Sequence, residues 1–172
     1  MKKTSIRFGL YGAVTICILF LASWTLGKGL SYDAQEVLGY SAMIISLSFV
    51  FFGIRYFRDK ENNGQLSFKQ AMTIGLLISL LTALAFGLLD VIYVKYINPE
   101  FMDDYYARSL AELESSLPAE EYQEQKAMLE SQKEFWMNPL MNFVLMSMTV
   151  FVIGAIITLI SGLILKRTPN SK

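Results

Sequence analysis

Four long apolar stretches constrain this chain more than any other feature of its sequence. They cover residues 8–27, 37–57, 68–93 and 139–165. Each reaches the roughly 18 to 20 mainly apolar residues that a helix needs to cross the hydrocarbon core of a bilayer. Hydrophobic residues occupy 53% of the 172 positions, which is above the share typical of soluble domains. The sequence therefore predicts an all-α integral membrane protein with four transmembrane helices, organised as one multi-pass domain over residues 1–172.

Residues 94–138 separate the third apolar stretch from the fourth and differ from both in composition. The segment carries ten acidic and four basic residues. Pro99 and Pro118 stand where helices begin, so we expect two helices over residues 99–116 and 118–136. Apolar side chains follow one face of each helix: Phe101, Tyr105, Leu110, Leu113 and Leu117 on the first, and Tyr122, Leu129 and Trp136 on the second. The segment is predicted to be an amphipathic helical hairpin outside the membrane.

The two apolar stripes of this predicted hairpin have more than one possible use. They can cover each other or lie on the bilayer surface, or they can bind a protein partner or a second copy of the chain. Helices that lie on anionic bilayers usually carry lysine and arginine on their polar face. Because this segment is acidic, the bilayer surface is a less favourable place to bury the stripes.

Small side chains recur at every fourth residue along the third apolar stretch. They form a continuous ridge on a helix: Ala71, Gly75, Ser79, Ala83 and Gly87. The fourth stretch has the same spacing at Gly154, Thr158 and Gly162. Apolar burial does not drive helices together inside hydrocarbon, so close packing along such ridges must do it. We expect the third and fourth spans to pack through these residues, and the third helix is also a candidate surface for a partner or a second copy.

The net charge is zero, but the charges are unevenly distributed about the four predicted spans. Ten basic and two acidic residues fall on the side of the two chain ends, whereas five basic and twelve acidic residues fall on the other side. Because positive charge marks the cytoplasmic side, we expect both termini to be cytoplasmic and residues 94–138 to be periplasmic. The basic residues lie beside helix ends and form no separate basic surface, so we expect no nucleic-acid partner.

Short polar motifs predict where helices and turns begin. Asp33 with Glu36, and Ser67 with Gln70, have the spacing of an N-terminal capping pair. Asn138-Pro139 places a capping residue before a proline at the first helical position. Asn62-Asn63-Gly64 is a turn cluster. These motifs place helix starts before the second, third and fourth spans, and a tight turn between the second and third.

The side chains that most enzymes use are scarce. The chain has no histidine, which removes Ser–His and Cys–His catalysis and imidazole metal ligands. Cys17, its one cysteine, falls within the first apolar stretch and is interpreted as a small packing residue. Glu120, Glu121 and Glu124 lack the glycine-bearing loop of a calcium site. We therefore expect no catalytic residue, no cofactor and no metal site.

Asp90 is the one acidic residue within an apolar span. Such a residue is a functional candidate by default, since an uncompensated charge at the bilayer centre costs at least ~2.5 kcal/mol. Asp90 lies three residues before Tyr93, which predicts a position at the outer interface, where water, Lys28 or Lys95 could satisfy it. Two interpretations stay open at this point: a structural carboxylate at a wet interface, and a site for ion or proton coupling.

The order of these elements and several short motifs resemble a known family. The motifs are Arg55-Tyr56-Phe57-Arg58-Asp59, Leu66-Ser67-Phe68-Lys69-Gln70-Ala71, Tyr96-Ile97-Asn98-Pro99-Glu100-Phe101 and Ile164-Leu165-Lys166-Arg167. Over nearly its whole length the chain resembles the uncharacterised bacterial membrane proteins grouped as domain of unknown function 4199. The resemblance implies a multi-pass topology in the bacterial cytoplasmic (inner) membrane, and it supplies no catalytic residue.

Two function hypotheses follow from these observations. The first is a non-enzymatic accessory, assembly or organising subunit, because the chain has small-residue ridges, an acidic outer hairpin and few catalytic groups. The alternative is a small oligomeric transporter or channel that uses Asp90 as a coupling carboxylate. Charged residues at the midplane or broken helices would favour the alternative, and neither is evident in the sequence.

Overall fold

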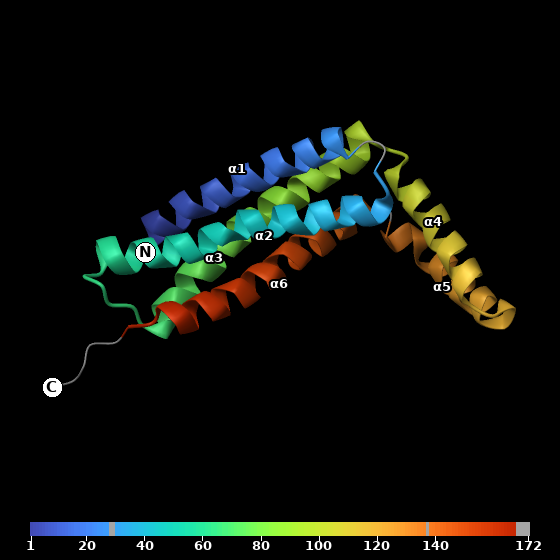
Figure 1. Ribbon diagram of the computed structural model, residues 1–172. Coiled ribbons are helices and arrows are strands. Elements are labelled where there is room, and N and C mark those ends of the chain that lie inside the picture. The colour runs from blue at the N-terminus through green and yellow to red at the C-terminus, as the bar shows by residue number, and fades with distance from the viewer. Residues whose placement is uncertain (28–29, 137, 168–172) are drawn as a thin grey trace. The chain divides into compact units, whose positions relative to one another are not determined.

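The computed structural model describes residues 1–27, 30–136 and 138–167, and the regular structure of this part is helical (Figure 1). Its elements in order are α1 (Lys2–Leu26), α2 (Tyr32–Tyr56), η1 (Phe57–Glu61), α3 (Phe68–Ile92), η2 (Tyr93–Ile97), α4 (Phe101–Ser116), α5 (Ala119–Trp136) and α6 (Pro139–Leu165). The elements η1 and η2 are single π-helical turns. Four of the helices are long and apolar enough to cross a membrane. The predicted all-α membrane fold, with a helical hairpin between the third and fourth spans, is confirmed.

The helix bounds differ from the expected ones at the starts of the first two spans, where α1 begins at Lys2 and α2 at Tyr32, and at the ends of the second and third spans. Both spans continue beyond the apolar stretch through a π-helical turn, η1 after α2 and η2 after α3. The π turns carry the helices past their aromatic ends into the charged positions Arg58–Glu61 and Lys95. The sequence shows where the apolar stretch stops but not that the helix continues there.

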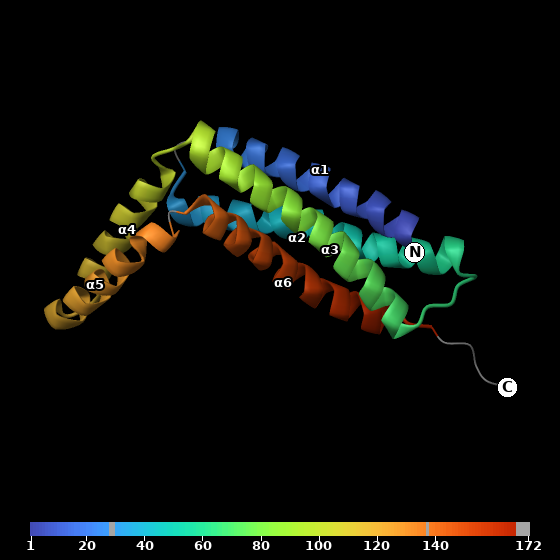
Figure 2. The ribbon, with the colours of Figure 1, turned by 180° about the vertical axis from the view of Figure 1, so that it is seen from behind.

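The chain divides into two compact units. The first unit contains Met1–Phe86 and the chain from Met146 onward, and the second unit contains Gly87–Leu145. In the first unit, α1, α2, the first part of α3 and the last part of α6 lie side by side, as Figures 1 and 2 show from opposite sides. Their core is apolar, and Ile16, Leu47, Ile74 and Ile78 are completely buried in it.

Within the first unit, α3 and α6 meet along the two small-residue ridges. A Cβ atom added at Gly75 would overlap Thr158, one added at Gly154 would overlap Ser79, and one added at Gly162 would lie 3.3 Å from the Cβ of Ala71. Each step of four residues forward along α3 is thus matched by a step of four residues back along α6. This antiparallel register brings the two backbones close together, as packing in hydrocarbon requires.

The other two spans also approach α3 through glycine. On α1, added Cβ atoms at Gly9 and Gly12 would overlap Leu81 and Thr82, and one at Gly53 on α2 would overlap Ile78. The sequence analysis did not single out these three glycines, because they are not spaced as a ridge. All three remaining spans therefore pack against α3, which is the central helix of the first unit.

Several serine and threonine side chains within the spans satisfy their hydroxyl groups locally. Ser46 donates to the Ala42 carbonyl at 2.7 Å, Thr82 to that of Ile78 at 3.1 Å, and Thr158 to that of Gly154 at 2.7 Å. Serine and threonine inside helices commonly make such bonds to the preceding turn. These three hydroxyls therefore allow close helix packing without needing a partner on another helix, whereas the buried hydroxyl of Ser147 on α6 has no hydrogen-bond partner among the described residues.

Polar contacts fix the end of the first unit that carries the chain start and the α2–α3 turn. Thr4 donates to Glu61 at 2.6 Å, and the N-terminal ammonium lies 3.4 Å from the same carboxylate. Leu66 and Arg167 exchange two backbone hydrogen bonds of 2.9 Å, which join the start of α3 to the end of α6. The starts and ends of all four spans are thereby tied together at this end.

Side-chain hydrogen bonds cap the first turns of α2, α3 and α6. Ser67 and Gln70 form the expected reciprocal box at 2.9 and 3.2 Å, and Asn138 Oδ1 accepts from the Leu140 N–H at 2.9 Å. Both predictions are confirmed. The pairing of Asp33 with Glu36 is wrong, because α2 begins earlier and Ser31 is its N-cap, accepting from the Ala34 N–H.

The turn between η1 and α3 forms at Asn62-Asn63-Gly64, where the sequence predicts it. Asn63 has φ 51° and Gly64 has φ 77°, the left-handed region that asparagine and glycine adopt most readily. Asn62 adds a side-chain bond of 2.7 Å to the Gln65 carbonyl. The turn prediction is confirmed.

Gly75→Ala should lower the free energy of unfolding by about 1 to 3 kcal/mol, because the added methyl group overpacks the contact with Thr158. Gly39→Ala is the matched control on α2, since nothing lies within 4 Å of an added Cβ there. Alanine at that position should be neutral or stabilising by up to about 1 kcal/mol. Reversible unfolding in mixed micelles measures both variants. Equal effects would show that the α3–α6 approach does not hold the spans together.

Candidate functional site

Asp90 lies near the end of α3, in the second unit, and only 7% of it is exposed. The prediction of a wet interface is therefore wrong for this carboxylate. No ion pair joins Asp90 to a cation among the described residues; Lys95 packs instead against the ring of Tyr96 at 5.5 Å. Lys28, the other expected partner, lies outside the described residues.

The partner of Asp90 is Asn142, in the first turn of α6. The Asn142 side-chain amide donates to Asp90 Oδ2 at 2.7 Å, and Asn142 is only 6% exposed. The Asn142 side chain therefore links two spans. An amide is well suited to this contact, because it donates to the carboxylate without adding a charge. The Asp90–Asn142 pair is the buried polar link of the second unit.

Aromatic residues surround the chain's exit from α3. Tyr93 is buried, and its hydroxyl accepts from the Asn98 side chain at 3.2 Å. Phe101 packs edge-on against Tyr93 at 5.7 Å and stacks on Tyr105 at 6.4 Å. These contacts join η2 to the first turn of α4 and give the start of the hairpin a defined conformation.

Lys133 connects the two helices of the α4–α5 hairpin. Lys133 on α5 lies 3.3 Å from the Asp103 carboxylate and 4.7 Å from the centre of the Tyr106 ring, both on α4. A lysine with its stem along an aromatic ring and its ammonium on a carboxylate combines apolar and ionic contact. This link was not predicted from the sequence; the signal for it was one of four basic residues in a strongly acidic segment.

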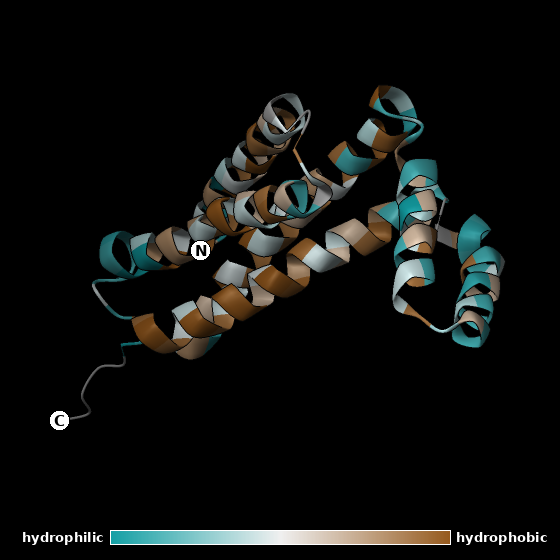
Figure 3. Ribbon diagram, turned by 45° about the vertical axis from the view of Figure 1, so that its right-hand side comes forward, coloured by the Kyte–Doolittle hydropathy of each residue, from teal (hydrophilic) through white to brown (hydrophobic). Residues whose placement is uncertain are grey.

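The apolar stripes of the hairpin are only partly covered. Leu113, Tyr122 and Leu129 are half-buried. Tyr105 is 58% exposed, so the apolar stripe of α5 does not cover it. The side chain of Trp136 lies outside the described part of the structure. Met128 and Phe135 add exposures of 54% and 50%. The hairpin thus keeps large apolar side chains accessible. Figure 3 shows by colour that its two helices are otherwise mostly hydrophilic.

Comparison with known families agrees with this architecture. Residues 7–167 match the family described as protein of unknown function (DUF4199). The chain belongs to the DUF4199 family. No curated protein matches it significantly, and no solved structure does so either. The match therefore assigns no chemistry to the residues of this DUF4199 protein.

The other predicted site residues of this DUF4199 protein lie on the packing faces of α3 and α6. Ala71, Gly75, Ser79 and Ala83 on α3, and Gly154, Thr158 and Gly162 on α6, are buried in the first unit, and Gly87 is buried at the start of the second unit. None of them forms a group with Asp90 in the described contacts. The described residues also contain no group of three or more His, Cys, Asp or Glu side chains that could hold a metal ion.

Asn142→Leu should destabilise this DUF4199 protein by about 1 to 3 kcal/mol, because it leaves the buried Asp90 carboxylate without its donor. Asp90→Asn should be close to neutral, since an asparagine oxygen still accepts from Asn142. The double change Asp90→Leu with Asn142→Leu should recover part of the stability, since it removes both polar groups. Unfolding in mixed micelles measures the free energy of unfolding of the wild type and of these variants. An Asn142→Leu variant as stable as the wild type would contradict the assignment of this pair.

Proposed function

We propose that this protein is a non-enzymatic membrane subunit that presents its α4–α5 hairpin to a protein partner outside the bilayer. The observation that carries the proposal is the exposure of Tyr105, Met128 and Phe135, at 58%, 54% and 50%, on a hairpin that is ordered by its own contacts. Exposed apolar clusters with a polar rim are typical of protein interaction sites. The α1–α2–α3–α6 spans serve in this proposal as the membrane anchor of the hairpin.

The charge of the hairpin segment favours a protein over the bilayer surface as the occupant. Residues 94–138 carry ten acidic and four basic residues. An anionic leaflet attracts basic segments and repels acidic ones. The same repulsion acts between two copies of the hairpin, so a second copy is the less favourable partner. The preferred partner therefore has a basic rim around apolar side chains.

A photo-crosslinking amino acid placed at Tyr105 or at Met128 tests this proposal in native membranes. We expect both positions to yield the same stoichiometric adduct. The control is Gln123, an exposed polar position on α5, which should yield much less of it. Tyr105→Glu should reduce the adduct formed at Met128, because a charge is added to the apolar contact. A lack of any specific adduct, with the chain correctly inserted, would contradict the proposal.

Ion or proton coupling at Asp90 is the second candidate function. It is favoured by one observation, the burial of a carboxylate within a membrane span with an uncharged amide as its described partner. An ionisable residue in such a place is commonly part of an ion or proton pathway. Purified protein in proteoliposomes should then show cation- or proton-dependent flux that Asp90→Asn abolishes while the fold persists. Equal flux in both proteins, or none, removes this candidate.

We further propose that the protein resides in the bacterial cytoplasmic membrane with both termini in the cytoplasm, on the basis of its basic-residue asymmetry. Single cysteines at Lys3 and at Ser116, each in a Cys17→Ser background, test the orientation. An impermeant thiol reagent added to intact spheroplasts should label the cysteine at 116 and leave the one at 3 unlabelled. Permeabilised cells, in which both react, are the control. The reverse pattern would place the hairpin in the cytoplasm.

A further inference from the structure

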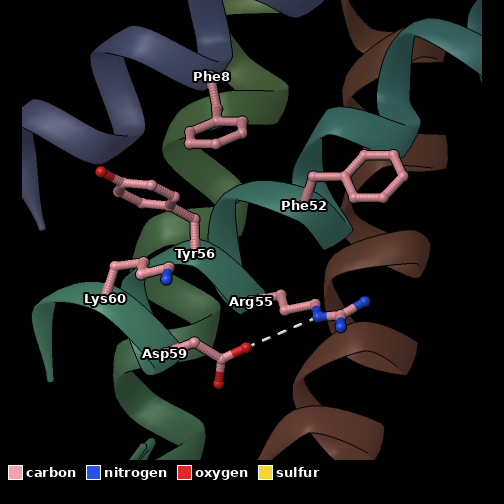
Figure 4. Close-up of a pocket in the computed structure, with 6 residues that line it drawn as sticks. All are labelled: Phe8, Phe52, Arg55, Tyr56, Asp59 and Lys60. Carbon is pink, nitrogen blue, oxygen red and sulfur yellow. Dashed lines mark ion pairs between the residues drawn. The ribbon is translucent and has the colours of Figure 1, made fainter. Parts of the chain in front are cut away.

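A hollow of about 500 Å³ opens between the start of α1 and the end of α2 in the first unit. Its lining consists of Phe8, Phe52, Arg55, Tyr56, Asp59 and Lys60. Figure 4 shows Phe8 reaching it from α1, with Phe52 and Arg55 on one side of α2 and Tyr56 and Lys60 on the other. Aromatic rings thus form the upper part of the hollow, and charged side chains form its lower part.

The hollow carries an excess of positive charge. Asp59, its carboxylate, is already engaged: Arg58 lies 2.6 Å from it and Arg55 lies 3.6 Å from it. Lys60 forms no ion pair with any described residue, and Arg55 keeps 58% of its side chain exposed. Arg7 packs above two of the lining rings, 5.9 Å from that of Phe8 and 5.4 Å from that of Tyr56. The charge of Asp59 is therefore already neutralised, and Arg55, Lys60 and Arg7 are close enough to the hollow to attract an anion.

The position of the hollow along α2 matches the depth of lipid headgroups. Phe52 is 50% exposed and ends a long apolar run, and the charged residues follow within one turn, at Arg55. Aromatic rings at the boundary of the hydrocarbon, with arginine and lysine just beyond it, occupy the interfacial layer of a bilayer. An occupant with an acyl chain beside Phe52 and an anionic group beside Arg55, within the field of Lys60, would satisfy both parts of the hollow.

We propose that this hollow binds an anionic phospholipid, with the phosphodiester of its headgroup held by Arg55 and with Lys60 adding positive charge from the other side of α2. Basic pockets between transmembrane helices are known to take anionic lipid headgroups. An arginine guanidinium can donate two parallel bonds to phosphate oxygens, and a lysine adds a point charge. A zwitterionic lipid fits less well, because its ammonium group would meet cations while Asp59 is occupied. This inference does not depend on the function proposed for the hairpin.

Native mass spectrometry of the full chain tests the proposal, after reconstitution with equimolar phosphatidylglycerol and phosphatidylethanolamine of matched acyl chains. The wild type should retain phosphatidylglycerol preferentially. Arg55→Gln with Lys60→Gln should weaken that retention by about fivefold for each cation removed. Lys60→Gln alone breaks no described ion pair, so it should show a partial loss with the fold unchanged.

The control is Lys69→Gln with Lys166→Gln, which removes the same charge from exposed positions outside the hollow. These two residues lie at the same end of the first unit, because the Leu66–Arg167 backbone pair joins their segments. The control variant should keep nearly all the retained phosphatidylglycerol. An equal loss in both double variants, equal retention of the two lipids by the wild type, or displacement of the lipid by millimolar inorganic phosphate would each overturn the proposal.

Discussion

Close approach of helix backbones along α3 is the constraint on which the rest of the first unit depends. In hydrocarbon the lipid tails are as apolar as leucine, so the spans gain little by burying apolar surface against one another. Dispersion contacts at short range have to supply the attraction, and each is small unless many are made together. Gly75 against Thr158 and Gly154 against Ser79 provide that closeness on one side of α3, and Gly12 and Gly53 provide it on the others. The exposed leucines and isoleucines of the same helices are left to face lipid.

The polar residues of the spans fall into two groups with different consequences. Ser46, Thr82 and Thr158 donate hydrogen bonds to carbonyl groups of their own helices, so they need no hydrogen-bond partner on a neighbouring helix. Asp90 and Asn142 instead depend on each other across two helices. A buried carboxylate whose donor is removed loses more than the bond itself, since its desolvation is no longer compensated. Change at Asp90 or Asn142 that breaks this bond should therefore destabilise the protein more than change at these three hydroxyls.

Local spacing explains why much of the fold could be predicted from the sequence. The length of the apolar stretches predicted the four spans. A four-residue period of small side chains predicted the ridge from Ala71 to Gly87, and the spacing of Ser67 and Gln70 predicted the start of α3. The Asp90–Asn142 bond and the Lys133–Asp103 contact join residues that are far apart in the chain, so no local pattern could reveal them. The hollow at Arg55 and Lys60 also needs α1 for its aromatic wall, which only the tertiary structure supplies.

Disulfide formation between α3 and α6 in native membranes tests the central packing claim most directly. The pair Ala71→Cys with Gly162→Cys, in a Cys17→Ser background, places two Cβ atoms about as close as disulfides require, since an added Cβ at 162 would lie 3.3 Å from that of Ala71. Ala71→Cys with Ile160→Cys is the control, because Ile160 is 51% exposed. The account predicts rapid oxidation of the first pair and little of the second. Equal rates, or faster oxidation of the control pair, would contradict it.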